Sequence, residues 1–265
     1  MHGLIAYECR RSQLTFLSSI SCQEASVPVD FRKINRVREP VSRSKSGVMG
    51  KIADVFSGRS RHAESQNELN GFRILLATAH ADHWQEQPFR LEYHHCDKKH
   101  RYTPDVLVVW GAQREAVEIK DDMQADLPEN QERFSLVREL LAEHSYYFRL
   151  WRKSEIYAEP RFANVGLLLR YRCVEVSLAE QERIRRVFAL IPNLCLRTLS
   201  ETRGIAIQSV LRMVLDGVLH INWWEAFTLD SKISIDPFGP QVWPVPPAGR
   251  SITESCKDSN GPIFI

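Results

Sequence analysis

Residues 101–120 read RYTPDVLVVWGAQREAVEIK, two apolar runs with a Gly-Ala-Gln break at 111–113. Val, Ile and aromatic residues favour strands, so the sequence predicts strands at Tyr102–Trp110 and Arg114–Lys120. Side chains alternate along a strand, and a two- or four-residue turn would bring Asp105 to the same face as Glu118 and Lys120. A three-residue turn would separate them, because a slip of one residue inverts a strand. We therefore expect two carboxylates and an ammonium to converge near the strand ends.

This set of groups suits metal-assisted hydrolysis of a phosphodiester. Mg²⁺ takes hard oxygen ligands, usually one or two carboxylates with waters and phosphate, and it polarises the phosphorus centre and supplies hydroxide. A lysine can orient the attacking water or offset charge on the phosphate. Pro104-Asp105 followed by Glu118-x-Lys120 resembles the PD-(D/E)xK signature of restriction-type nucleases. A hairpin with an ordinary salt bridge is the alternative, since short motifs also match by chance.

The composition is that of an ordinary globular protein. With 265 residues and 43% hydrophobic content, the chain suits one large domain or two smaller ones. Its six cysteines form no CxxC pair, which favours a reducing cytoplasm. No apolar run is long enough to cross a membrane, so we expect no membrane association.

Charge is concentrated near the N-terminus. Between Arg32 and Arg61, nine basic residues face two acidic ones, although the whole chain carries only +2. Such a segment suits contact with DNA phosphates through counterion release, and Lys51, Arg59 and Arg61 are the candidate contacts. A solvated basic linker is the alternative.

A third acid is expected from the helix that the spacing predicts over Ala63–Ala79. Glu68 lies on the same face as Phe72 and Leu75. An acid on a core-facing stripe is unusual unless it is paired or binds a metal. The alternative is a Glu at the edge of the stripe that reaches solvent, and Glu64 is the rival candidate.

Further elements are expected downstream: an extended stretch over His83–Tyr93, a helix over Pro128–Glu143, a strand over Tyr146–Trp151, and a helix or strand over Phe162–Tyr171. The cluster His94, His95, Cys96 and His100 is interpreted as a polar hairpin tip, because a structural zinc site needs a second cluster of ligands. Two strands, a helix and a strand with acids at one edge indicate an α/β restriction-endonuclease-like fold, in which helices flank a mixed central sheet.

A second unit begins at Ser177, whose capping box with Glu180 starts a helix. Helices are expected next at Leu194–Ser200 and Ile205–Asp216, followed by a hairpin of 218–222 and 227–235. This order is that of a winged helix. Arg203, Gln208 and Arg212 lie before or on the polar side of the third helix, which usually enters a DNA groove. Docking of a protein is an equal alternative, because fold does not fix function.

Four parts follow from these patterns. Residues 1–61 are an N-terminal extension and basic arm, 62–175 a PD-(D/E)xK nuclease domain, 176–236 a winged-helix domain and 237–265 a Pro-rich tail that is expected to be extended or disordered. Deleting everything after Val176 should therefore leave a folded catalytic domain.

The order of motifs resembles the TnsA family, the endonuclease subunits of heteromeric (Tns-type) bacterial transposases. The resemblance covers residues 30–236. It rests on Glu68-Leu69-x-x-Phe72, Glu86-Gln87-Pro88, Tyr102-Thr-Pro-Asp105 and Glu118-Ile-Lys120, on Gly50-Lys51 in the basic arm, and on Asp216-Gly-Val-Leu-His-Ile-Asn222 and Phe227 near the C-terminus.

The resemblance implies a bacterial, cytoplasmic DNA endonuclease. It would cut the 5′ ends of a transposon for cut-and-paste transposition, while a TnsB-like transposase cuts and joins the 3′ ends. A TnsC-like AAA+ ATPase would contact the C-terminal domain, and the substrate would be double-stranded DNA at transposon ends. By position, Glu68, Asp105 and Glu118 would bind Mg²⁺, with Mn²⁺ as a substitute, and Lys120 would serve the attacking water. A free-standing restriction-type nuclease and a non-catalytic adaptor between DNA and partners are the alternatives. The intact acids and lysine disfavour the adaptor.

Overall fold

The computed structural model describes residues 14–17, 50–78, 81, 83–96 and 98–238. The chain forms two compact units. The N-terminal unit combines Met1–Ile52, Ser60–Leu69 and Ala81–Glu155, and the C-terminal unit combines Ala53–Arg59, Asn70–His80 and Ile156–Ile265. Most of the predicted basic arm, and the Pro-rich tail from residue 239 onward, lie outside the described residues.

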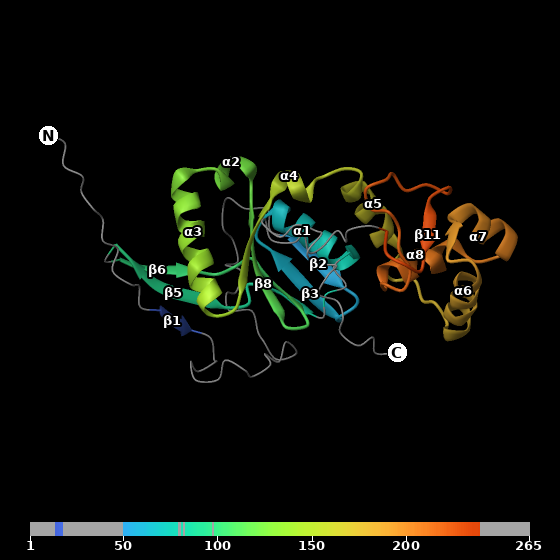
Figure 1. Cartoon of the computed structure of the whole chain (residues 1–265), viewed down its shortest axis with the longest axis horizontal. Helices are drawn as coiled ribbons and strands as arrows, with labels where there is room; N and C mark the ends of the chain where they lie inside the picture. Colours follow the sequence, from blue (N-terminus) through green and yellow to red (C-terminus); the bar gives the residue numbers. More distant parts are fainter. Residues whose placement is uncertain (1–13, 18–49, 79–80, 82, 97, 239–265) are drawn as a thin grey trace, which may run out of the picture. The chain divides into compact units, whose positions relative to one another are not determined.

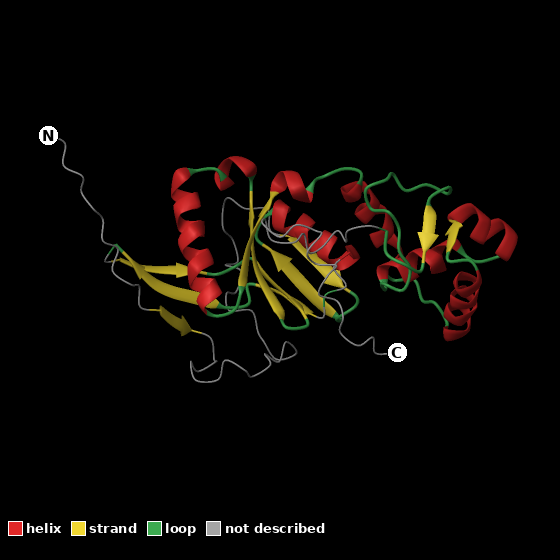
Figure 2. Cartoon of the chain, in the orientation of Figure 1, coloured by secondary structure: helices red, strands yellow, loops and turns green. Residues whose placement is uncertain are grey.

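The N-terminal unit is built on a four-stranded mixed sheet in the order β4–β7–β8–β9 (Figures 1 and 2). The β4–β7 and β7–β8 pairs are antiparallel and β8–β9 is parallel. A parallel pair needs a crossover connection, and two helices of this unit, α2 and α3, provide it. This sheet fits the predicted restriction-endonuclease-like fold. The strands and helices are β4 (His83–Glu86), β7 (Val106–Trp110), β8 (Gln113–Lys120), β9 (Tyr147–Arg152), α2 (Asp122–Ala125) and α3 (Pro128–Glu143).

The turn between β7 and β8 sets the register on which the predicted site depends. Trp110 pairs with Gln113, so the loop contains only two residues. The first is Gly111 with φ +54°, a conformation that glycine adopts without strain. Val106 pairs with Val117, and the same register continued by one place puts Asp105 opposite Glu118. The two-residue turn among the predicted alternatives is confirmed.

The structure interrupts two of the predicted extended stretches, so that each contains parts of two strands. Tyr102–Trp110 divides into β6 (Lys98–Tyr102) and β7, because Pro104 between them has no N–H to donate to a ladder. His83–Tyr93 divides into β4 and β5 (Arg90–His95), and Gln87 at the break has φ +43°.

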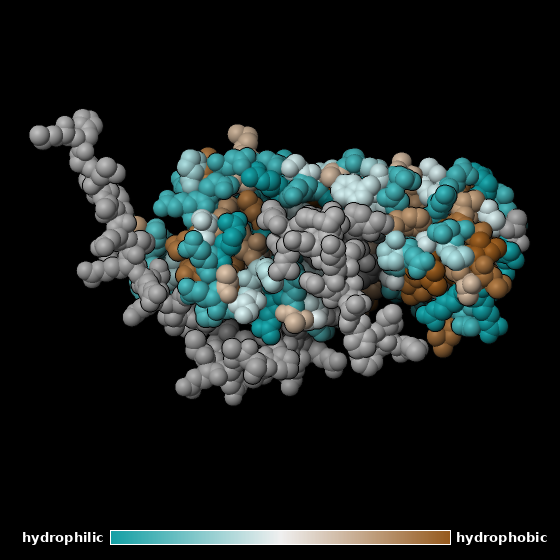
Figure 3. All heavy atoms as spheres, viewed as in Figure 1, coloured by the Kyte–Doolittle hydropathy of each residue, from teal (hydrophilic) through white to brown (hydrophobic). Residues whose placement is uncertain are grey.

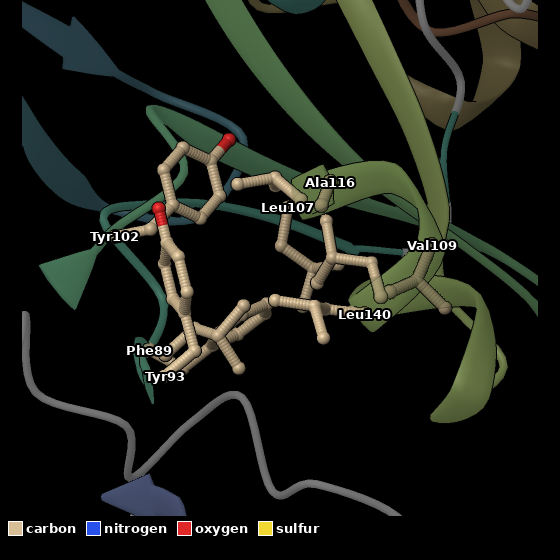
Figure 4. Close-up of a cluster of buried hydrophobic side chains, with 10 residues drawn as sticks. Phe89, Tyr93, Tyr102, Leu107, Val109, Ala116 and Leu140 are labelled. Carbon is tan, nitrogen blue, oxygen red and sulfur yellow. The ribbon is translucent and has the colours of Figure 1, made fainter. Parts of the chain in front are cut away.

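A second sheet, in the order β1–β5–β6, belongs to the same unit, with β1 at Leu14–Leu17. One core joins it to the central sheet and α3. Figure 4 shows Phe89, Tyr93 and Tyr102 facing Leu107, Ala116 and Leu140 across this cluster. Val137 and Leu141 of α3 complete it, so the face of the central sheet that carries Leu107 and Ala116 is the face that α3 covers.

Two segments span both units. The hairpin of β2 (Gly50–Asp54) and β3 (Arg59–Ala63) was not predicted. The predicted helix over Ala63–Ala79 is confirmed as α1 (Gln66–Thr78), which begins later because β3 takes the residues before Glu64.

The C-terminal unit contains the three predicted helices, α6 (Leu178–Leu190), α7 (Leu196–Arg203) and α8 (Ile207–Leu215). Ser177 caps α6 as predicted, since its side chain accepts a hydrogen bond from the Glu180 N–H. The Phe162–Tyr171 segment is helical, as α5 (Arg161–Leu168) and η1 (Leu169–Tyr171). A short α4 (Lys153–Ile156) precedes it.

The predicted hairpin of 218–222 and 227–235 forms only in part. β11 (Lys232–Ser234) pairs antiparallel with β10 (Asn193–Cys195), and the expected partner contributes only the bridge between His220 and Ser234. Asn164 holds the segment 223–227, which links the two predicted strands. Its side chain donates to the carbonyls of Trp223 and Glu225 and accepts from the Phe227 N–H. Within the part of the chain that the structure describes, no helix has the length and apolar character needed to span a membrane.

Candidate active site

Asp105, Glu118 and Lys120 meet at one end of the β7–β8 pair, as predicted. The backbone N–H of Ile119 donates to Oδ2 of Asp105 at 2.7 Å, which fixes this carboxylate beside β8. Glu118 is buried, and the Nζ of Lys120 lies 2.8 Å from its Oε1. Glu118 and Lys120 are two residues apart on one strand, so they share the face that α3 covers.

The site concentrates negative charge in a poorly solvated place. Burial raises the pKa of Asp105 well above its usual value, and the neighbouring Glu118 and Glu68 carboxylates raise it further. Burial alone would lower the pKa of Lys120, but Glu118 and Asp105 outweigh it and the pKa is raised. Lys120 therefore stays charged, and Asp105 is a carboxylate that a further cation would stabilise.

Glu68 contributes to this electrostatic field from the first turn of α1. Burial raises the pKa of its carboxyl and Lys120 acts against that shift. Its oxygens also cap the helix, because they accept hydrogen bonds from the Glu64 N–H at 2.8 Å and the Ser65 hydroxyl at 2.9 Å. The Ser65 Oγ in turn accepts from the Glu68 N–H, which is one half of a capping box, and the reciprocal bond to Glu68 comes from the N–H of Glu64 instead of Ser65. Glu68 is half-buried, and its carboxylate already has hydrogen-bond donors.

The rival acid, Glu64, is linked to the site through Gln87. The Gln87 side chain donates to Glu64 Oε1 at 3.0 Å, and its backbone N–H donates to the carbonyl of Asp105 at 3.0 Å. Gln87 thus connects Glu64, two residues before α1, with Asp105, the residue before β7.

The donor groups present suit a hard cation. Oε2 of Glu118 is buried and accepts no hydrogen bond from any described residue, and such an oxygen is costly unless something binds it. Carboxylate oxygens are the ligands that Mg²⁺ takes. Nevertheless, in the described residues no three His, Cys, Asp or Glu side chains gather closely enough to hold one ion together.

Sequence reasoning missed two side chains of the site. Tyr102 is buried, and burial followed by the charges of Glu118 and Asp105 raises the pKa of its phenol well above the usual value. The guanidinium of Arg133 on α3 lies 3.7 Å from Glu118 Oε1. Arg133 precedes the buried Val137 by four residues, so its place at the edge of the core-facing stripe could have been found from helical spacing.

The predicted DNA contacts in the N-terminal part divide into two kinds. Lys51 and Arg59 are exposed. Arg61 is buried, forms a 3.2 Å ion pair with Glu86 and covers the ring of Trp84 at 4.3 Å. Arg61 is therefore part of a structural ion pair in the N-terminal unit, which disfavours the predicted DNA contact.

The predicted contacts of the C-terminal unit divide in the same way. Arg203 and Gln208 are exposed. Arg212 pairs with Asp216 at 3.0 Å and donates to the carbonyls of Arg172 and Val174. These bonds tie α8 to the chain that precedes α6, which disfavours the predicted DNA contact of Arg212.

Comparison with known proteins identifies the part that carries the site. Residues 80–152 match the family model described as TnsA-like endonuclease N terminal. The match contains Asp105, Glu118 and Lys120, whereas Glu68 precedes it. None of the curated proteins compared matches the chain. Residues 80–152, which include the central sheet with α2 and α3, are thus similar to the N-terminal domain of TnsA-like endonucleases, and this match supports assignment to that family.

Proposed function

We propose that the chain is a Mg²⁺-dependent DNA endonuclease of a Tn7-type transposase complex that cuts the 5′ ends of a transposon. The observation that carries this proposal is the convergence of Asp105, Glu118 and Lys120 within the matched segment. Paired carboxylates with an adjacent ammonium are the groups that metal-assisted phosphodiester hydrolysis requires.

Each residue has a distinct role in this proposal. Asp105 and Glu118 are the ligands of Mg²⁺, or of Mn²⁺ in its place, and when bound the ion polarises the phosphorus centre and lowers the pKa of its water. Lys120, hydrogen-bonded to Glu118, orients the attacking water and offsets charge that develops on the phosphate. Glu68 adds negative charge, and it becomes a direct ligand only by exchanging its helix-capping bonds.

DNA binding is assigned to exposed basic side chains outside the site, namely Lys51 and Arg59 in the N-terminal hairpin and Arg203 with Gln208 in the C-terminal unit. The order α6, β10, α7, α8, β11 with β10 paired to β11 supports a winged-helix domain. Gln208 lies in the first turn of α8, the helix that would approach a groove.

Protein partners are assigned to the same C-terminal unit. Figure 3 shows brown, apolar patches on its surface. Large apolar side chains are exposed on it, including Leu178, Leu190, Trp224 and Leu229, and an apolar surface of this kind suits a protein interface. We propose a TnsC-like AAA+ ATPase as the partner here and a TnsB-like transposase as the enzyme that cuts the 3′ ends.

The test is strand-mapped cleavage of labelled transposon-end DNA by the full chain, alone and with both partners. We expect cuts at the 5′ ends only with the partners present and only with Mg²⁺ or Mn²⁺. Cleavage by the chain alone at sites of its own would instead indicate a restriction-type nuclease. A folded chain that assembles with the partners and never cuts would indicate an adaptor.

A further inference from the structure

Arg133 is a second cation at the site, and the PD-(D/E)xK pattern does not account for it. It comes from α3, whereas Glu118 and Lys120 come from β8. Its Nη2 lies 3.7 Å from Glu118 Oε1, the same oxygen that Lys120 Nζ approaches at 2.8 Å. One carboxylate oxygen is therefore shared by two cations from different elements.

The two cations are held differently. Lys120 is within hydrogen-bond distance of Glu118, whereas 3.7 Å is too long for a hydrogen bond from Arg133. The Arg133 side chain is 41% exposed and the Glu118 side chain 5% exposed. Arg133 thus extends from a buried carboxylate to solvent, and a second anion arriving from solvent can compete for its guanidinium.

The charge of Arg133 also acts on the surrounding residues. It opposes the rise in the pKa of Tyr93 and of Tyr102, and it opposes the rise in the pKa of Lys120. Its side chain lies over the ring of Phe134, 5.1 Å from the centroid. The guanidinium is therefore placed beside the site and supported there by an aromatic ring.

We propose that Arg133 binds a non-bridging oxygen of the DNA phosphate that enters the site. The inference rests on the proposed function, since it takes DNA as the substrate. A phosphodiester adds a fourth negative charge to those of Glu68, Asp105 and Glu118, whereas Lys120 and one Mg²⁺ together supply only three positive charges. A guanidinium matches phosphate oxygens with two parallel N–H donors, which an ammonium cannot do. Arg133 exchanges its loose contact with Glu118 for the phosphate, and Lys120 keeps its bond to Glu118.

Arg138 provides a matched control. It lies on the same helix, is exposed, and has its guanidinium 5.3 Å from the ring centroid of Phe148. Arg133→Ala and Arg138→Ala therefore each remove one exposed, ring-supported positive charge from α3, but only Arg133 contacts Glu118. Arg133→Gln removes the charge and keeps most of the side chain, so it tests the same point if Arg133→Ala does not fold.

The first measurement is binding of transposon-end duplex by the full chain over a salt series without added metal. Each lost phosphate contact lowers the slope of log affinity against log salt by about one. We expect this decrease for Arg133→Ala and no decrease for Arg138→Ala. The second measurement is 5′-end cleavage with partners and Mg²⁺, where Arg133→Ala should lose about 10²-fold in rate and Arg133→Lys should retain part of it.

An unchanged slope together with unchanged cleavage in Arg133→Ala would overturn the inference, and so would an equal loss of slope in Arg138→Ala. The proposed function fails separately. If the wild-type chain binds DNA but never cuts it with its partners, the function is wrong and the salt slopes still decide the role of Arg133. If the wild-type chain does not bind DNA, both the proposed function and the proposed role of Arg133 are wrong.

Discussion

Glu118 has two carboxylate oxygens in different surroundings. Oε1 is shared by Lys120 and Arg133, while Oε2 is buried without a donor among the described residues. Asp105, beside it, has a pKa raised first by burial and then by Glu118 and Glu68. A pair of this kind is costly to keep ionised and becomes favourable when a cation joins it. The site therefore lowers the stability of the folded chain as long as no cation joins these carboxylates.

This cost predicts that Asp105→Asn stabilises the metal-free chain. The folded pKa of Asp105 is raised above the usual value of 3.8, so the stability that this group contributes is present below that value and is lost as the pH rises through the folded pKa. At about pH 8 in EDTA, the variant should melt about 2–4 °C higher, which corresponds to ~1 kcal/mol in a chain of this size. At low pH the difference in melting temperature between the variant and the wild-type chain should vanish.

Asp126→Asn is the control for this experiment. The pKa of Asp126 is lowered by its hydrogen bond from Arg152, so the stability that Asp126 contributes is present above its usual pKa and is lost as the pH falls. Its replacement should not stabilise the chain at any pH. If Asp105→Asn melts at or below the wild-type temperature at about pH 8, the electrostatic account of the site is wrong.

Replacing Arg61 should affect the stability of the fold, whereas replacing Arg59 should affect DNA binding. Arg61→Ala leaves the buried Glu86 carboxylate without this cation, and removing one partner of a buried pair costs about 3–5 kcal/mol. Arg59→Ala removes an exposed charge, so it should leave stability unchanged and lower the salt slope of DNA binding by about one. Chemical denaturation and DNA titration of both variants check this. A stable Arg61→Ala chain with weakened DNA binding would restore the predicted DNA contact.

At the level of elements, the sequence was most informative where a local rule decides the geometry. The alternation of strand residues and the short Gly-containing turn sufficed to place Asp105 opposite Glu118. Helical spacing sufficed for the helix at Pro128–Glu143, which has the predicted bounds. The capping role of Glu68 also follows from a local rule, since Ser65-x-x-Glu68 is a capping-box sequence. The apolar stripe of the same helix predicts only that Glu68 faces the core.

The capping box makes the role of Glu68 testable. Ser65→Ala removes the helix cap at a cost of about 1 kcal/mol, yet leaves the Glu68 charge in place. Glu68→Gln removes the charge and keeps one of the two oxygens that accept these hydrogen bonds. If Glu68 serves the metal site, 5′ cleavage should fall by about tenfold or more in Glu68→Gln and stay normal in Ser65→Ala. The reverse pattern would leave Glu68 as a helix cap alone.

At the level of the whole molecule, long-range pairing was beyond sequence reasoning. Strand β11 pairs along its length with β10, about forty residues earlier, and pairs with its neighbour in sequence only through the bridge between His220 and Ser234. The C-terminal unit contains every residue from Ile156 onward, so it begins about twenty residues before the predicted domain boundary at 176. The cause is tertiary: Asn164 holds the 223–227 segment, and Arg212 bonds the carbonyls of Arg172 and Val174. No local pattern records these contacts.

The deletion after Val176 should therefore destabilise what remains, contrary to the expectation from sequence. It removes the partners of the buried Asn164 and uncovers α5, whose Val165 and Leu168 are buried in the full chain. Limited proteolysis of the truncated chain should cut within 156–176 much faster than in the full chain. Equal protection in both would show that the predicted boundary is also a folding boundary.

The central claim is that Asp105 and Glu118, with Lys120, form the centre that cuts the 5′ ends. The most direct measurement is strand-mapped cleavage by Asp105→Asn and Asp126→Asn in the complete transposase complex with Mg²⁺. The partner's cuts at the 3′ ends serve as the internal control for assembly. The account predicts that Asp105→Asn abolishes 5′ cuts while 3′ cuts persist, and that Asp126→Asn cuts both ends normally. Normal 5′ cutting by a folded Asp105→Asn chain would contradict it.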